Sequence, residues 1–278
     1  MGSSFRTISI AAIVVAMTSC IPDPLDLEVD QLKPKLVVTS HVDQGTVDIL
    51  LTRSVGALDA NDDTDLFELI NEASVSDAVV RIQSNGVTYD LNAFGGAYAI
   101  SGMPLVAGQT YALYAHSAKD GTVSATTVYP QPISFRDVSV KTTIIGNDSL
   151  AQVFYSIDDP SGQNWYIVTA AHVRSGANKE HLNPRIVAKT IDDTGLDGTI
   201  IGGDFKIPFI EVQTGDFVTV TLQNVGKDYF DYVKLREDTQ FGIAAAVGEP
   251  VNYPTNIQGG LGFFALFYID SHKFTIGE

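Results

Sequence analysis

The chain has a single cysteine among its 278 residues and few basic side chains. One cysteine cannot form an internal disulfide or supply a zinc site of several cysteines. With 17 Lys and Arg against 33 Asp and Glu, the formal charge is −16. An acidic surface repels phosphates, so no nucleic-acid partner is expected. Hydrophobic residues make up 45% of the chain and charged residues 18%, which excludes a disordered chain and indicates a globular one.

Long hydrophobic runs are also missing. The apolar stretch near the N-terminus, Ile8–Met17, has ten residues, whereas a membrane-spanning helix needs about 20. Arg6 and the free amine precede this stretch, and small residues follow it. This order is typical of a secretory signal peptide, so residues 1–19 are expected to be removed.

The only cysteine, Cys20, follows the signal directly. The sequence Met17-Thr18-Ser19-Cys20 fits a bacterial lipobox, although leucine is the usual residue at the position of Met17. In that chemistry the thiol is alkylated with diacylglycerol, the peptide is cut before Cys20, and the new amine is acylated. Three acyl chains would hold the mature chain on a membrane stably. The alternative is an ordinary buried thiol at Cys20.

Residues 20–34 predict an extended tether, because prolines and acidic residues that repel one another both favour open chain. Its prolines are Pro22, Pro24 and Pro34, and its acids are Asp23, Asp26, Glu28 and Asp30. One interpretation is a simple spacer. The other is an export signal, because the acids resemble those that direct lipoproteins to the cell surface in some outer-membrane bacteria. We therefore expect an outer-membrane, lipid-anchored protein, with exposure at the cell surface left open.

The remaining chain alternates apolar and polar residues at period two, which predicts a mainly β fold. Residues 35–130 are expected to form an immunoglobulin-like antiparallel β-sandwich, with a hairpin turn at Asn85-Gly86. Tyr129-Pro130-Gln131-Pro132 predicts a boundary, and residues 131–278 a second β-rich domain. Its strands are expected at Phe135–Ile145, Leu150–Ile157, Trp165–Val173, Arg185–Ile191, Ile207–Val212 and Phe217–Asn224. A half-buried stripe of Tyr229, Tyr232, Val233 and Arg236 predicts one short helix near the C-terminus, at 227–240.

Several short motifs occur in a particular order. They are Pro34-Lys35-Leu36-Val37-Val38, Asp158-x-Pro160-x-Gly162 ahead of Asn164-x-Tyr166, the helix with Tyr229 and Tyr232, Glu249-Pro250, and Asn256-Ile257-x-Gly259-Gly260-Leu261-Gly262-x-Phe264. With the lipobox, this order resembles the Bacteroidota outer-membrane lipoproteins that carry domain of unknown function 4249. The resemblance implies an immunoglobulin-like sandwich and a second β-rich domain. It also implies a gene usually found beside a TonB-dependent outer-membrane barrel of the SusC-like kind. No catalytic residues are established for the family, so none are carried over.

The glycines near the C-terminus have two interpretations. Gly259, Gly260 and Gly262 permit positive φ and close approach of backbones, which suits a structural turn that Asn256 caps through its side chain. A phosphate-binding loop would need a helix after the glycines. Apolar and aromatic residues follow instead, which favours the structural turn.

Little else points to a particular chemistry. The sequence has no GxSxG elbow, no HExxH and no P-loop. No firm metal site and no cofactor are expected, but Asp59, Asn61, Asp62, Asp63 and Asp65 offer oxygen ligands that suit Ca²⁺, without the EF-hand frame. A weaker version is Asp192, Asp193 and Asp197. Asp148-Ser149-Leu150 fits a short pattern for O-glycosylation at Ser149 in this group of bacteria. Aromatic residues that could stack on sugar rings, or fill the core instead, are Trp165, Tyr166, Tyr229, Phe230 and Tyr232.

Two functions from different classes follow. The first is a non-catalytic outer-membrane lipoprotein, accessory to a TonB-dependent (SusC-like) transporter in nutrient uptake. In this hypothesis the partners are the membrane, through the lipid on Cys20, and the outer-membrane barrel. The second is a free-standing lipoprotein of the cell surface that binds a glycan or a peptide. An enzyme is not expected, since no nucleophile and base can be linked from the sequence.

Overall fold

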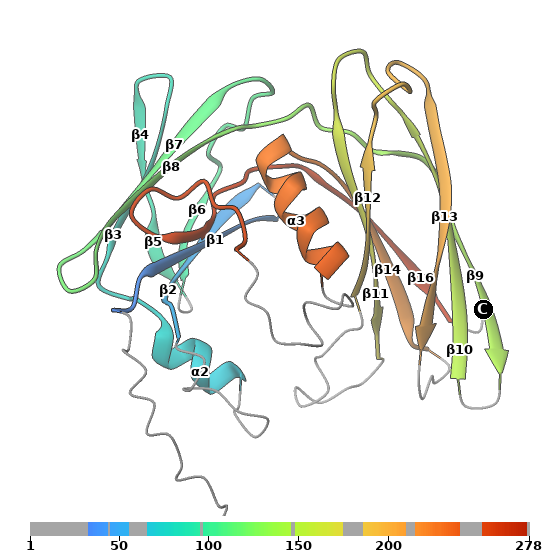
Figure 1. The fold of residues 1–278 in the computed structure, drawn as a ribbon, viewed down its shortest axis with the longest axis horizontal. Helices are drawn as coiled ribbons and strands as arrows, with labels where there is room; N and C mark the ends of the chain where they lie inside the picture. Colours follow the sequence, from blue (N-terminus) through green and yellow to red (C-terminus); the bar gives the residue numbers. More distant parts are fainter. Residues whose placement is uncertain are drawn as a thin grey trace, which may run out of the picture. The chain divides into compact units, whose positions relative to one another are not determined.

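The computed structural model describes residues 33–43, 45–55, 66–94, 97–145, 148–174, 186–209, 215–239 and 252–276. Residues Pro34–Glu278 form one compact unit. The expected fold class is confirmed, because these residues form several antiparallel sheets with a helix near the C-terminus (Figure 1). Among the described residues, none of the helices has the length and apolar character to cross a membrane.

Two sheets form the first sandwich. One has the strand order β15-β1-β2-β6-β5, and the other has the order β4-β3-β7-β8. The strands of the first sheet are β1 (Leu36–Asp43), β2 (Thr46–Arg53), β5 (Asn92–Phe94), β6 (Ala97–Ser101) and β15 (Leu261–Phe263). Those of the second are β3 (Val79–Ser84), β4 (Val87–Asp90), β7 (Thr110–Ser117) and β8 (Gly121–Val128). A short helix, α2 (Leu66–Ala73), lies between β2 and β3 in the chain.

The core of the first sandwich follows directly from the period-two pattern. In β2, Val47, Ile49 and Leu51 are fully buried, while the residues between them are partly exposed. In the opposite sheet, Ile82 of β3 and Tyr111 of β7 are fully buried in the same cluster. Since alternate residues of a strand face opposite sides of the sheet, each strand contributes one apolar row to the core between the two sheets.

An ion pair links the two sheets of the first sandwich at one end. Arg53, the last residue of β2, donates from Nε to Oδ1 of Asp120 at 2.6 Å and from a terminal nitrogen to Oδ2 at 2.7 Å. Only 15% of the Asp120 side chain is exposed. The hydrogen bond from Arg53 is the main cause that holds the pKa of Asp120 below its usual value. The ionised form of Asp120 therefore stabilises the folded chain.

We expect Asp120→Asn to lower the free energy of unfolding by about 1–2 kcal/mol at neutral pH. Because the folded-state pKa lies below the unfolded one, the stabilisation is complete above about pH 4 and is lost as the pH falls through the folded-state pKa. Wild type and variant should therefore converge as the pH falls below the folded-state pKa of Asp120. Chemical unfolding at several pH values checks this. Asp90→Asn is the control, because Asp90 pairs with Arg81 at 2.6 Å but is 70% exposed, and its loss should change stability little.

Two further sheets form the second sandwich. One has the order β13-β10-β9, and the other has the order β12-β11-β14-β16. The strands are β9 (Phe135–Ile145), β10 (Asp148–Asp158), β11 (Trp165–Val173), β12 (Ile186–Asp192), β13 (Ile200–Phe209), β14 (Phe217–Asn224) and β16 (Ile269–Thr275). Its core contains fully buried residues from both sheets, among them Val153 and Ile207 on one side and Val168 and Val220 on the other.

Strand β13 begins seven residues earlier than the strand predicted at Ile207, because two glycines hid its first half. Gly202 and Gly203 lie inside the strand and pair with Ser156 and Tyr155 of β10. A Cβ atom on Gly203 would lie closer to the Tyr155 ring than real Cβ atoms do. The glycine therefore marks the close approach of an aromatic ring, which a sequence pattern cannot distinguish from a turn.

The predicted helix is α3 (Lys227–Thr239). Phe230 is its buried residue, while Tyr229, Tyr232 and Val233 are partly exposed. Tyr229 stacks on Phe267 with ring centroids 5.4 Å apart, and Tyr232 lies 4.8 Å from Phe263. The aromatic stripe of the helix thus packs on the C-terminal segment of the chain.

That C-terminal segment serves two cores at once. Phe264 and Leu266 belong to the core of the first sandwich, whereas Ala265 and Phe267 belong to a separate cluster with Phe230 of α3. Just before it, β15 pairs in parallel with β1, with Val38 opposite Gly262, and Figure 1 shows the two strands side by side. Residues from the end of the chain therefore complete a sheet that begins at residue 36, and alternate side chains join both sandwiches.

Candidate functional site: a cleft between the two sandwiches

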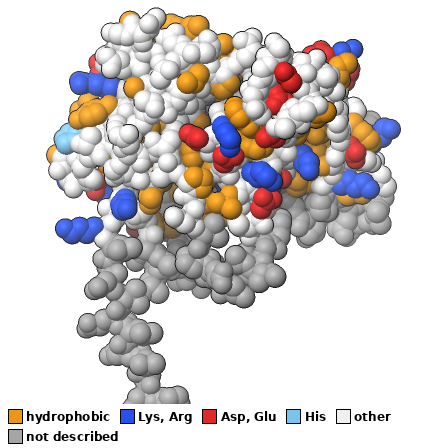
Figure 2. Space-filling model, turned by 45° about the horizontal axis from the view of Figure 1, so that its top comes forward, with side chains coloured by type: hydrophobic (Ala, Val, Ile, Leu, Met, Phe, Trp, Pro, Cys, Tyr) orange, Lys and Arg blue, Asp and Glu red, His pale blue; other side chains and the backbone are white. Residues whose placement is uncertain are grey.

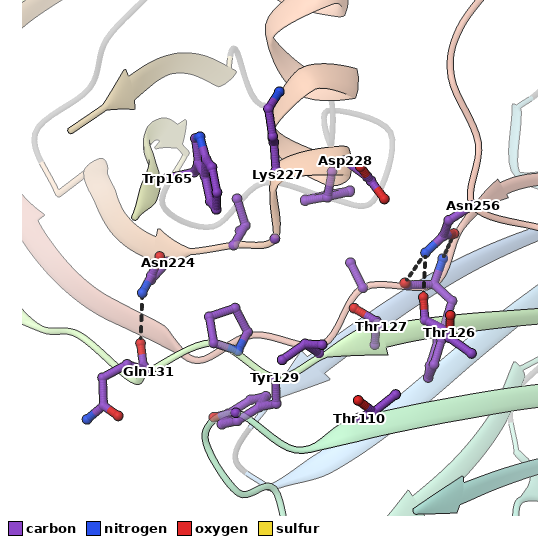
Figure 3. A pocket seen from close by; sticks show the side chains of 18 of the residues that line it. Thr110, Thr126, Thr127, Tyr129, Gln131, Trp165, Asn224, Lys227, Asp228 and Asn256 are labelled. Atoms are coloured by element: carbon purple, nitrogen blue, oxygen red, sulfur yellow. Dashed lines mark hydrogen bonds between the residues drawn. The ribbon is translucent and has the colours of Figure 1, made fainter. Parts of the chain in front are cut away.

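A cleft of about 770 Å³ opens where strand ends of the two sandwiches meet, and we call it the central cleft (Figure 3). Its lining comes from residues 107, 108, 110, 126–131, 163–165, 224–229, 256 and 263–265. This volume lies in the range of sites that bind small molecules or segments of chain.

The first wall is the end of β8 and the residues after it. Tyr129 is buried, and its backbone N–H donates to the carbonyl of Gln109 at 3.0 Å, while its carbonyl accepts from the N–H of Gly108 at 2.9 Å. Its neighbour Val128 is half exposed beside the cleft. Pro130 then follows, and the missing N–H of proline ends the ladder there. This wall is therefore the edge of a sheet.

The opposite wall carries Trp165, the only tryptophan in the chain. Figure 3 shows it across the cleft from Thr126 and Thr127. Its cross-strand partner in β12 is Asp192. The pKa of Asp192 is lowered mainly by the hydroxyl of Thr194, then by the backbone N–H of Thr194, with a smaller contribution from Trp165. The indole thus lies beside a carboxylate, and the wall offers an aromatic surface.

Two buried amides shape this wall. Asn224 donates from Nδ2 to the carbonyl of Gln131 and to Oδ1 of Asn164, both at 3.1 Å. Asn164 in turn donates to the carbonyls of Gly162 at 2.7 Å and Pro160 at 3.3 Å. Both donor hydrogens of each amide are therefore used within the protein, and the amides hold the connection between the two sandwiches.

The floor of the cleft is held by Asn256. Its Oδ1 accepts from the N–H of Phe264 at 3.0 Å, and its Nδ2 donates to the carbonyl of Phe264 at 2.8 Å and to that of Thr126 at 3.3 Å. One side chain thus connects β8 with the C-terminal segment. The glycine turn beside it is spanned by Thr255, whose hydroxyl donates to the carbonyl of Gly262 and accepts from the N–H of Ile257.

The charges of the cleft balance. Lys227 and Asp228 line it at the start of α3, and Lys227 also pairs with Asp231 at 2.6 Å, which raises the pKa of the lysine. Figure 2 shows basic and acidic side chains interspersed on one face of the molecule, with hydrophobic side chains between them. The described lining contains neither histidine nor cysteine. Hydrogen bonds and apolar contacts are what this lining offers, and both suit binding.

A second cluster lies in the loops that end and begin strands of the second sandwich. Carboxylate oxygens of Asp159, Asp193 and Asp197 all lie within 4.8 Å of one another. Such oxygens are the donors that Ca²⁺ takes. Each carboxylate, however, already accepts a hydrogen bond from the protein: Asp159 from the Tyr166 hydroxyl and the N–H of Gly198, Asp193 from the N–H of Asn164, and Asp197 from the N–H of Gly162. The cluster therefore organises the two loops. Burial is the main cause that raises the pKa of Tyr166, and the hydrogen bond from its hydroxyl to Asp159 raises it further.

The family of the chain follows from its match over most of its length. The family model described as Domain of unknown function (DUF4249) matches residues 22–272. The chain belongs to this family. A search of curated proteins finds no match.

Two solved structures are similar to this DUF4249 chain at low identity. One is a chain of a cytokine receptor complex (crystal form 1A), with 9% identity, a TM-score of 0.25 and coverage of 85% of this chain and 94% of that chain. The other is the chicken interferon gamma receptor alpha chain, with 10% identity, a TM-score of 0.20 and coverage of 70% and 90%. At such TM-scores the likeness supports no inference about this chain.

Some residues singled out in this DUF4249 sequence lie outside the described ranges: Cys20 and the acidic run Asp59, Asn61, Asp62, Asp63 and Asp65. Ser149 lies in β10, opposite Ile144 of β9 and Phe209 of β13. Gly259 and Gly262 have positive φ, 79° and 91°, and strand β15 follows the turn that Gly259 begins. The weaker calcium candidate is the trio Asp192, Asp193 and Asp197. Asp193 and Asp197 do lie together, but the third carboxylate of the cluster belongs to Asp159 and not to Asp192.

Sequence reasoning missed the central cleft as a unit. Thr126 and Asn224 carry no motif, and the sequence identifies Gln131 only as part of the boundary predicted at Tyr129-Pro130-Gln131-Pro132. The signal that leads nearest to the site is the DUF4249 motif Asn164-x-Tyr166 with Gly162 before it, because Asn164 bonds Asn224 and the following Trp165 lines the cleft. Of the five aromatics considered, Tyr166 and Phe230 are buried, and Trp165 and Tyr229 line the cleft.

Proposed function

We propose that this DUF4249 chain is a non-catalytic, lipid-anchored outer-membrane protein of Bacteroidota that assists a TonB-dependent (SusC-like) transporter in nutrient uptake. The observation that carries the proposal is the lipobox ending at Cys20, directly ahead of the family match that starts at residue 22. The anchor confines the protein to the membrane that holds the barrel. A shared membrane raises the effective concentration of two partners, so a modest contact is enough to keep them together.

The contact itself would be made by the folded unit, beyond the tether of residues 20–34. The central cleft supports this role, because hydrogen bonds from Asn224 and Asn256 hold its walls in place. A surface that is ordered before binding loses less conformational entropy when it associates. The partner would be the barrel, and the barrel would select the nutrient.

Co-purification from native membranes tests the proposal. Membranes are extracted in mild detergent, the lipoprotein is purified by a C-terminal tag, and its companions are identified by mass spectrometry. We expect a large β-barrel at close to equal stoichiometry. Arrival of the lipoprotein alone, from membranes in which the barrel is shown to be present and intact, would overturn the proposal.

Cys20→Ala should abolish acylation and remove the protein from the outer-membrane fraction. The thiol is the acceptor of the diacylglycerol, so alanine leaves no site for the anchor. Metabolic labelling with an alkyne fatty acid, followed by density fractionation of membranes, measures both effects. Met17→Leu is the matched control: it brings the lipobox closer to its usual form and should leave label and location unchanged. Labelling that persists in Cys20→Ala would contradict the assignment.

The central cleft also favours a second candidate, a free-standing surface protein that binds a glycan or a peptide. Its aromatic wall, with Trp165 beside Asp192, is the kind of surface on which the apolar face of a sugar ring stacks. Retention of the purified protein on immobilised polysaccharides would support the glycan form of this candidate. If the protein is retained on none of these polysaccharides, glycan binding is excluded.

A further inference from the structure

Strand β8 is an edge strand of the four-stranded sheet, and one half of that edge is already used by the chain itself. Ser124 exchanges both backbone hydrogen bonds with Gln258, at 3.2 Å and 2.8 Å. Two outward bonds from one residue show that the N–H and C=O of Ser124 point away from β7. At the other end of the strand, the N–H of Tyr129 points the opposite way and donates to Gln109, beside β7.

Alternation along β8 then fixes the direction of the backbone N–H and C=O groups between Ser124 and Tyr129. In an antiparallel pair, residues two apart direct their backbone groups to the same side. Thr126 and Val128 therefore direct theirs outward, as Ser124 does. The carbonyl of Thr126 accepts from the side chain of Asn256. The N–H of Thr126 and both backbone groups of Val128 have no partner among the described residues.

The open half of the edge lies along the central cleft, whose lining includes Thr126, Thr127 and Val128. The chain's own segment leaves the edge at Asn256, where a side-chain amide replaces the backbone as the donor. Across the cleft stand the half-buried rings of Trp165 and Tyr229. The site thus combines a row of unused backbone groups with an apolar wall facing it.

We propose that the open edge of β8 binds an extended segment of a protein partner as an added strand, with an apolar side chain of that segment directed at the Trp165 wall. The inference rests on the proposed function, which supplies the protein partner, and it adds the place on this chain where that partner binds. Backbone groups that face outward on every second residue, about 6.6 Å apart at 3.3 Å per residue, match the backbone of an added strand and not a sugar. The formal charge of −16 disfavours a strongly acidic segment.

Val128→Pro tests the edge directly. Proline removes the outward N–H and places a ring on the edge, while the bonds between β8 and β7 do not involve that N–H. Edge strands tolerate proline where the N–H faces away from the sheet. Thr88→Pro is the matched control. Leu91, the residue directly after β4, bonds inward to Val80 at 3.0 Å. By parity Val87 and Tyr89 also direct their backbone groups toward β3, so the N–H of Thr88 faces outward, on the opposite edge of the same sheet.

The probe is a phage-displayed library of random octapeptides, selected on the detergent-solubilised lipoprotein, and the selected peptide is then synthesised. We expect Val128→Pro to weaken binding of that peptide by about tenfold or more, and Thr88→Pro to leave it unchanged. Equal binding to wild type and Val128→Pro, or a library that yields no binder, would overturn the inference. Binding of oligosaccharides together with failure of every peptide would also overturn it.

Amide hydrogen exchange of the wild-type protein, with and without the selected peptide, tests the same inference without any substitution. The selected peptide should slow exchange at the amides of Thr126 and Val128 and leave that of Thr88 unchanged. Protection elsewhere, with none at Thr126 and Val128, would overturn the inference. Co-purification of the barrel tests the proposed function separately. If wild type and Val128→Pro retain the barrel equally, the transporter role stands and the edge of β8 is not the point where the barrel attaches.

Discussion

Replacing Gly262 with alanine should lower the free energy of unfolding by about 3–5 kcal/mol. Gly262 has a φ of +91°, and a Cβ atom there would lie about 2.1 Å from the carbonyl oxygen of Val38 in the neighbouring strand. Both the backbone conformation and the space therefore exclude a side chain. Relief of the clash would require β15 to separate from β1, and that would also disturb Phe264 just after it.

Chemical unfolding of the purified protein, followed by circular dichroism, measures this change. Gly86→Ala is the control, because Gly86 also has positive φ, +78°, but a Cβ atom added there would meet no other atom within 4 Å. It carries only the conformational cost, about 1 kcal/mol. Equal losses in the two variants would show that the contact between β15 and β1 does not constrain residue 262.

Phe264→Ala should cost about 3–5 kcal/mol, because Phe264 is fully buried in the core of the first sandwich. Truncation removes a large apolar surface and leaves a cavity under the floor of the central cleft. The expected result is an earlier unfolding transition and faster hydrogen exchange in β1 and β15. Thermal unfolding and exchange measured by mass spectrometry check the two effects.

Phe94→Ala provides the comparison. The Phe94 side chain is 77% exposed on the short edge strand β5, so its removal should change stability by no more than about 0.5 kcal/mol. A large loss for Phe94→Ala, or a small one for Phe264→Ala, would contradict the division into core and surface residues.

Local patterns predicted most single strands. The alternation in Phe217–Asn224 and in Trp165–Val173 matched β14 and β11 to the residue, because strands buried on a core face repeat at period two. The same patterns gave no information on which strands pair. Ser40 and Ala265 exchange hydrogen bonds across 225 positions of sequence, and the local sequence around either residue does not predict the other as its partner.

The candidate site was harder to predict for a related reason. Its side chains come from the ends of strands in both sandwiches, and most are ordinary threonines, amides and aromatics. Asn256 is predicted to cap the glycine turn, and its oxygen and nitrogen bond the backbone of Phe264 on the far side of that turn, with a further bond to the carbonyl of Thr126. The residue was identifiable from the motif, but its partners depend on how the C-terminal segment lies between the two sandwiches.

The place of β15 in the first sheet has a consequence for the order in which the protein becomes complete. Strand β1 begins at Leu36, and the strand that covers its free edge ends at Phe263. A chain that crosses a membrane from its N-terminus therefore delivers β1 early and its partner almost last. Through that interval the backbone groups on one side of β1 stay unpaired, and an unpaired edge invites contact with other chains. Until the last residues are available, the edge of β1 is open to contact with other chains.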